Sequence, residues 1–230
     1  MIKKNNIQGL EKAIHGDTAL ATNLLGDAFQ AGNRKAFELL LKRGANVNHA
    51  SLNTEWGPYP LLHHFARNEE LYWLKTSIEH GGILDLESRN GITPLSESIE
   101  GKKSENALYL IDAGANIHGR IQNKPFYDLA IGNMLFEAAF KMLELKADPN
   151  SITFHGATAI DHLRDYCSER GGPIVNNVPF RPESSVWCTK ILQWYKDRDL
   201  DILNATFVIR EEKLGNWKIP SFTQENSQPQ

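Results

Sequence analysis

The feature that most constrains this chain is a pattern that returns about every 31 to 37 residues. Positions that can open a helix recur 34, 31 and 34 residues apart, at Pro60, Pro94, Pro125 and Ala159. Positions that can close a second helix recur 37, 33 and 32 residues apart, at Gly44, Gly81, Gly114 and Lys146. A pair of short helices cannot bury both apolar faces alone, so each copy must stack on its neighbours. The two anchors therefore predict a row of helical hairpins.

The clearest copy of the pattern is the segment 90–118. Thr93 can cap a helix through its hydroxyl, and Pro94 follows at the first helical position, where its missing N–H has no cost. We expect this helix to end at Gly101, a residue that tolerates positive φ. A second helix, closed by Gly114, carries apolar residues at i, i+3 and i+4 spacing. These apolar residues are Ala107, Leu110 and Ile111.

The sequences TPLSESI and LIDAGANI of this copy resemble the ankyrin repeat, in which TPLHxA opens one helix and LLLxxGAxVN closes the next. The resemblance implies an all-α fold, an ankyrin-repeat solenoid of stacked helix-turn-helix hairpins with capping elements. About five degenerate repeats are expected. The histidine of TPLH is replaced in every copy, by Leu62, Ser96, Tyr127 and Asp161. In the family this histidine ties one hairpin to the next turn, so we expect those ties to be weaker or differently made here.

The pattern organises residues 1–218 into a single solenoid. Residues 1–18 have the apolar spacing of a capping helix, and residues 204–218 form the cap at the other end. The expected repeats between these caps are 19–49, 50–86, 87–118, 119–150 and 151–203. The tail 219–230 is polar and contains prolines, so we expect it to be disordered.

The fifth repeat contains an inserted loop, 169–184, with three prolines and no helical period. Ser184 or Ser185 is a suitable N-cap for the helix that follows. We interpret the loop as a cap over the last repeat, because a terminal repeat must shield its exposed face. A second contact surface is the alternative interpretation.

The composition narrows the class of protein. A net charge of −3 argues against a nucleic-acid-binding surface, which needs clustered Lys and Arg. The N-terminal segment has basic residues but no apolar run behind them, and no stretch of eighteen apolar residues occurs anywhere. We therefore expect a soluble, cytoplasmic protein. Without a secretory signal, Cys167 and Cys188 are interpreted as buried thiols rather than a disulfide.

The sequence contains no recognisable catalytic motif, because it lacks a CxxC pair, HExxH, a Gly-rich phosphate loop and GxSxG. His63 and His64 are adjacent, so on a helix they point about 100° apart and do not make a metal-ligand pair. His155, Asp161 and His162 could bind zinc or act as an acid–base site. We interpret them as finger and helix residues, and expect no enzyme, no cofactor and no bound metal. A metal-dependent enzyme is the less favoured alternative.

Ankyrin stacks as a family bind proteins, so the resemblance implies a partner-binding surface at the finger tips and at exposed positions of the first helices. The corresponding residues are Asn53, Glu55, Trp56, Arg89, Asn90, Glu97, Arg120, Gln122, Asn123, Phe154 and His155. Trp56 is the strongest candidate, because an indole in a long surface loop buries much area at little entropic cost. Packing of Trp56 against Tyr59 or the adjacent finger is the alternative.

These features predict a non-catalytic module that binds and masks a partner protein and is a monomer when unbound. Small degenerate ankyrin proteins of bacteria resemble immunity or antitoxin proteins, and some resemble effectors that bind host proteins. The expected partner is therefore a protein, such as a toxin or a host protein, and neither a nucleic acid nor a membrane. A scaffold that joins two proteins is the alternative, with the loop 169–184 as its second surface.

Overall fold

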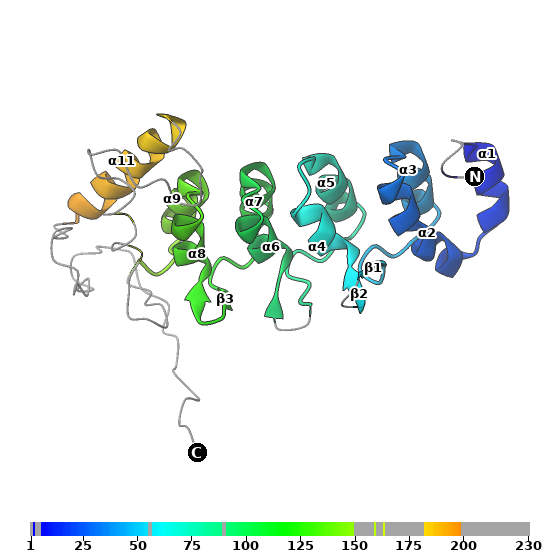
Figure 1. The fold of residues 1–230 in the computed structure, drawn as a ribbon, viewed down its shortest axis with the longest axis horizontal. Coiled ribbons are helices and arrows are strands. Elements are labelled where there is room, and N and C mark those ends of the chain that lie inside the picture. The colour runs from blue at the N-terminus through cyan, green and yellow to red at the C-terminus, as the bar shows by residue number, and fades with distance from the viewer. Residues whose placement is uncertain are drawn as a thin grey trace, which may run out of the picture. The chain divides into compact units, whose positions relative to one another are not determined.

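The computed structural model describes residues 6–54, 57–88, 91–149 and 182–198, together with Ile2, Ala159 and Leu163. Over these residues the protein is mostly helical, and its strands form short two-stranded hairpins (Figure 1). The predicted helical class is confirmed at this level, whereas the hairpins were not predicted. The chain divides into two compact units, Met1–Asn116 and Ile117–Gln230.

The first unit consists of helix pairs that follow one another along the chain. Its elements are α1 (Ile7–Ile14), α2 (Thr18–Gln30), α3 (Arg34–Lys42), β1 (Ser51–Thr54), β2 (Gly57–Pro60), α4 (Leu61–Ala66), α5 (Leu71–Glu79), α6 (Pro94–Glu100) and α7 (Ser104–Asp112). Within each pair α2 packs on α3, α4 on α5 and α6 on α7. Between pairs, α4 packs on α6 and α5 packs on α7, so like helices meet (Figure 1).

The second unit begins with a short hairpin and continues as helices. Its elements are β3 (Arg120–Ile121), β4 (Lys124–Pro125), α8 (Phe126–Gly132), α9 (Phe136–Glu144) and α11 (Pro182–Lys196). Helix α8 packs on α9, and α11 packs on α9. The predicted start of the last helix at Ser184 or Ser185 is wrong, because α11 begins at Pro182. Proline suits the first turn, where its missing N–H needs no partner.

The start of α6 confirms the local prediction. Thr93 is the N-cap, its hydroxyl accepts from the Ser96 backbone, and the Ser96 hydroxyl bonds back to the Thr93 backbone. The predicted end of the helix is confirmed, because Gly101 is the C-cap of α6, although its φ of −74° does not use the positive region that glycine tolerates. The positive φ falls one residue later, at Lys102. Gly114 follows the end of α7 with the expected positive φ of 92°.

An aromatic cluster joins the first two helix pairs. Trp73 of α5 is 4 % exposed and lies among three phenylalanine rings. The ring centroids of Phe29 and Phe37 lie 5.4 and 5.3 Å from Trp73, both in edge contact, and Phe65 stacks at 6.3 Å. Each such ring buries a large apolar area, so packing between hairpins is the main role of Trp73.

A buried asparagine ties the second and third pairs together. Asn106 of α7 is 1 % exposed. Its Nδ2 donates to the carbonyls of Phe65, Ala66 and Asn68, at 3.2, 3.0 and 2.8 Å. These carbonyls lie at the C-terminal end of α4, where helical carbonyls lack partners within the helix. The expectation that ties between hairpins are made differently here is consistent with this bond and with the bond of His63 described below.

The two hairpins occupy the connections between helix pairs. Strands β1 and β2 pair antiparallel, with Leu52 opposite Tyr59, and the Leu61 N–H closes the base by donating to the Ala50 carbonyl at 2.9 Å. Strands β3 and β4 are joined by Gln122 and Asn123, whose φ values are 49° and 64°. Two consecutive positive φ values are typical of the tight turn whose twist matches a β-hairpin. We call residues 51–60 the first finger and residues 120–125 the second finger.

The cysteine prediction needs correction. Cys188 of α11 is 2 % exposed, as expected, but it is disulfide-bonded and is not a free thiol. The chain has one other cysteine, Cys167, which lies outside the described residues. A disulfide depends on the approach of two Cβ atoms, which sequence spacing does not show. The cysteines therefore no longer support the cytoplasmic expectation.

Among the helices that the structure describes, none is both long and apolar enough to cross a membrane. Several further predictions concern residues outside the described part of the chain. These are the inserted loop up to residue 181, the C-terminal cap 204–218 and the tail 219–230.

We predict that Asn106→Ala lowers the free energy of unfolding by about 1–3 kcal/mol, because it removes the side-chain donor from the carbonyls of Ala66 and Asn68. Urea-induced unfolding measures the change. Asn23→Ala, at an exposed position of α2, is the control and should stay within about 0.5 kcal/mol of the parent. Equal effects of the two substitutions would contradict the assigned role of Asn106.

Candidate functional site

The structure places five of the predicted contact residues. Asn53 lies on β1 and is exposed. Arg120, Gln122 and Asn123 are exposed on the second finger, where Arg120 Nη2 donates to the Asn123 carbonyl at 2.8 Å. Glu97 lies on α6. The other predicted residues lie outside the described part of the chain; they are Glu55, Trp56, Arg89, Asn90, Phe154 and His155.

Glu97 was expected at an exposed position of a first helix, and this expectation is wrong. The residue is only 4 % exposed. The Tyr59 hydroxyl donates to Oε1 of Glu97, and Arg67 Nη1 donates to Oε2 at 2.8 Å. A buried carboxylate is tolerated only when it is paired and hydrogen-bonded, and both of its oxygens are occupied here.

These contacts assemble a cluster from three elements. Tyr59 comes from β2, His63 and His64 come from α4, Arg67 is the C-cap of α4, and Glu97 comes from α6. We call these five residues the Glu97 cluster. It connects the first finger, the second helix pair and the third helix pair, so it sets the position of the finger on the helices.

The two histidines lie against the tyrosine. The ring of Tyr59 meets those of His63 and His64 at centroid distances of 5.3 and 5.4 Å, in edge contact. His63 is completely buried, and its Nε2 lies 2.9 Å from the Ile92 carbonyl, so Nε2 carries the proton and donates. Among the described residues, His63 Nδ1 and His64 Nε2 are buried without a hydrogen-bond partner.

Burial controls the electrostatics of the cluster. It lowers the pKa of His63, although the Ile92 carbonyl, Glu97 and the Leu86 backbone act in the opposite direction. Burial also lowers the pKa of His64, against the attraction of Glu97. Burial and the hydrogen bond to Glu97 raise the pKa of Tyr59. The cluster therefore holds two neutral imidazoles at neutral pH, beside an ion pair of which only the carboxylate is buried.

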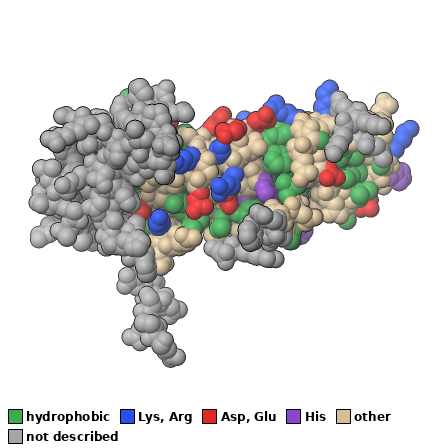
Figure 2. Space-filling model, viewed as in Figure 1, with side chains coloured by type: hydrophobic (Ala, Val, Ile, Leu, Met, Phe, Trp, Pro, Cys, Tyr) green, Lys and Arg blue, Asp and Glu red, His purple; other side chains and the backbone are tan. Residues whose placement is uncertain are grey.

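Arg67 is the part of the cluster that a partner can reach. Its side chain is 51 % exposed, although Nη1 is held by Glu97. The described surface around the helices mixes charged and hydrophobic side chains, with histidine between them (Figure 2). An arginine fixed by a buried carboxylate loses little side-chain entropy when a second protein binds it.

Sequence reasoning did not find this cluster. The adjacent histidines were considered only as metal ligands, and Tyr59 only as a packing partner of Trp56. No signal in the sequence pointed to the cluster, because Glu97 lies between Ser96 and Ser98 in α6, and a glutamate among polar residues is ordinarily exposed. The partners come from residues about 30 and 38 positions earlier, a separation that only the stacking of helix pairs removes.

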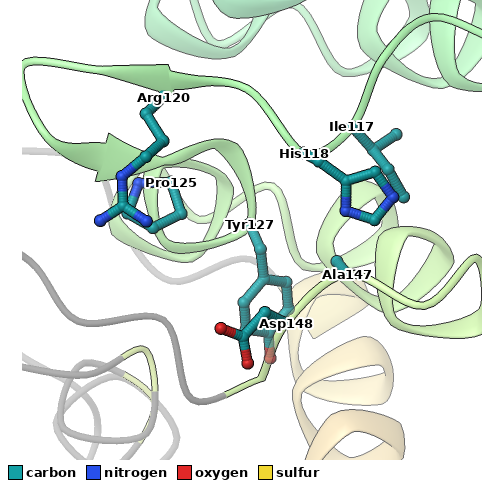
Figure 3. A pocket seen from close by; sticks show the side chains of 7 residues that line it. All are labelled: Ile117, His118, Arg120, Pro125, Tyr127, Ala147 and Asp148. Carbon is teal, nitrogen blue, oxygen red and sulfur yellow. The ribbon is translucent and has the colours of Figure 1, made fainter. Parts of the chain in front are cut away.

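The second unit has a small pocket beside its finger (Figure 3). Arg120 and His118 lie at opposite sides of it, and Tyr127 points toward Asp148 (Figure 3). The Tyr127 and Tyr195 hydroxyls are 3.1 Å apart, and Tyr195 donates to the Pro149 carbonyl at 3.1 Å. The charged lining residues all have interactions within the protein. The pocket is therefore less suited to a ligand than the exposed finger beside it.

Neither a scan against protein-family models nor a search of curated proteins found a match to this chain. Within the described residues, no group of three or more His, Cys, Asp or Glu side chains could hold a metal ion. His155, Asp161 and His162 lie outside those residues, so the alternative metal site stays a prediction.

We predict that Tyr59→Phe lowers the free energy of unfolding by about 1.5–3 kcal/mol, because it removes a hydrogen bond to a buried carboxylate. Tyr109→Phe is the matched control, because Tyr109 is half-buried and its hydroxyl has no hydrogen bond among the described residues. Chemical denaturation of both variants gives the comparison. If the two variants lose the same stability, the bond between Tyr59 and Glu97 does not fix the finger.

Proposed function

We propose that this protein is an ankyrin-type repeat protein that binds and masks a partner protein without catalysing a reaction. The observation that carries this proposal is the packing of like helices on like helices in the first unit, with a finger directly before α4. Such stacking leaves finger and first-helix positions free to vary without disturbing the core.

The first finger and Arg67 form the binding surface in this proposal. Asn53 is exposed on β1, and Arg67 lies beside the finger through its bond to Glu97. Glu97 does not contact the partner in this proposal; it holds Tyr59 and Arg67 in place by hydrogen bonds. Arginine and large aromatic residues are enriched among residues that dominate binding energy, so Arg67 and Trp56 are the proposed anchors.

The second finger supplies a further contact in this proposal. Gln122 and Asn123 are exposed at its turn, and Arg120 is tied to the Asn123 carbonyl. A turn held in this way is already close to one conformation, which lowers the entropic cost of binding. Glu55, Arg89, Asn90, Phe154 and His155 complete the proposed set.

Masking is the proposed action because a binding surface without catalytic groups changes a partner only by occupying it. By analogy with small degenerate ankyrin proteins of bacteria, the partner is a toxin and the protein is an immunity or antitoxin protein acting in the cytoplasm. No cofactor is needed for this role. The analogy rests on the resemblance of the repeats and not on the fold alone.

The proposal predicts that the tagged protein, recovered from its native cells at neutral pH, carries one protein partner in stoichiometric amount. The recovered partner is then used in binding assays with the purified chain. Recovery of no stoichiometric protein partner would contradict the proposed function.

Substitution separates the proposed surface from the rest of the molecule. Asn53→Arg should weaken binding of the recovered partner by about tenfold or more, equivalent to ~1.4 kcal/mol, because it adds bulk and charge at the finger. Glu79→Arg places the same side chain at an exposed position of α5 and should leave the affinity unchanged. Equal affinities of the two variants for the partner would show that the first finger is not part of the interface.

A further inference from the structure

The first finger is held to the rest of the protein by several contacts. Its base is closed by the bond from Leu61 N–H to the Ala50 carbonyl. The Leu52 side chain lies so close to Gly26 that a Cβ on Gly26 would sit 2.8 Å from Leu52 Cδ2. A third attachment is Tyr59, which contacts His63, His64, Glu97 and Ser88. Tyr59 is therefore the point at which the finger meets α4 and α6.

The tyrosine attachment depends on the histidines being neutral. His63 donates from Nε2 to the Ile92 carbonyl, and its Nδ1 is buried without a partner among the described residues. His64 likewise has a buried Nε2 without a partner there. A second proton on either ring would create a buried cation, which is costly, although the Leu86 backbone offsets part of that cost at His63.

The charges around the rings do not cancel this cost. Glu97 on α6 attracts a proton to both rings, while Arg67 on α4 opposes protonation of His64. Each acidic oxygen of Glu97 is already used, one by Tyr59 and one by Arg67. Glu100 at the end of α6 also acts on Arg67 of the cluster.

We propose that the Glu97 cluster is a proton-operated latch, in which protonation of His63 or His64 releases Tyr59 and with it the first finger. An imidazolium needs the carboxylate that now accepts from the Tyr59 hydroxyl, so the two compete for Glu97. The loss of that bond and of the edge contacts frees β2 from α4. If the proposed function holds, acidification also weakens partner binding, because the finger is part of the binding surface.

The direction of the pH dependence follows from the neutral rings. The pKa values of both histidines lie below their ordinary value in the closed form, whereas an opened finger exposes His64 to water. Above about pH 6.5 the two histidine rings are neutral in both the closed and the open form, so the closed form keeps its full stability. As pH falls below that value, the open form binds protons that the closed form does not, and the closed form loses stability.

The experiment uses the full chain without a partner. Histidine ring signals are followed by NMR between pH 7.5 and 5, and amide hydrogen exchange is measured over the same range after correction for the intrinsic rate. We expect His63 and His64 to titrate below the ordinary range of histidine. We also expect the opening equilibrium of the amides in 51–60 to rise by about tenfold or more, while those of α7 do not change.

Two variants test the role of the rings. His64→Gln removes one titrating group at the half-buried position and should reduce the pH response of the finger. His49→Gln changes an exposed histidine next to the finger and should preserve the response. The latch is overturned if amide exchange of the finger does not depend on pH in the parent. It is also overturned if His64→Gln keeps the full pH response and His63 does not titrate.

The latch and the proposed function are tested by different experiments, so either can be contradicted without the other. Exchange and NMR on the isolated chain decide the latch, whether or not a partner is found. Recovery of a partner at neutral pH decides the proposed function. A partner that stays bound at pH 5 with unchanged affinity while the finger opens would show that the latch does not regulate binding.

Discussion

The structure depends on the need of each short helix pair to bury its apolar face against a neighbouring pair. The helices of the first unit have six to thirteen residues, and isolated helices of this length are marginal in water. In the first unit the apolar faces are buried by contacts between like helices. Trp73 lies among three phenylalanine rings where the first two helix pairs meet. Once this packing is in place, the order of the pairs fixes which distant residues meet.

Polar residues then make the junctions specific. Asn106 donates to three carbonyls at the end of α4, and His63 bonds to the Ile92 carbonyl of the following segment. Apolar faces alone would allow helices to slide, whereas buried hydrogen bonds are satisfied at one register only. Glu97 acts in the same way nearer the surface, because its two carboxylate oxygens accept from Tyr59 of the finger and from the exposed Arg67.

The same cluster joins stability to the proposed binding role. A finger that is attached through a buried carboxylate presents its exposed residues in one arrangement, and this reduces the entropy lost when a partner binds. The attachment also includes two neutral imidazoles, whose protonation is opposed by burial. The attachment of the finger therefore contains the two groups whose protonation the proposed latch uses.

The sequence by itself determined the local elements. The period of the anchors, the Thr93–Pro94 start of α6 and the positive φ of Gly114 follow from interactions within a few residues. Only the tertiary structure decided that Glu97 is buried, that Tyr59 and Arg67 hold it, and that Cys188 is disulfide-bonded. The physical reason is that burial and pairing depend on residues brought together by stacking, and helical periodicity carries no information about which distant side chain completes a contact.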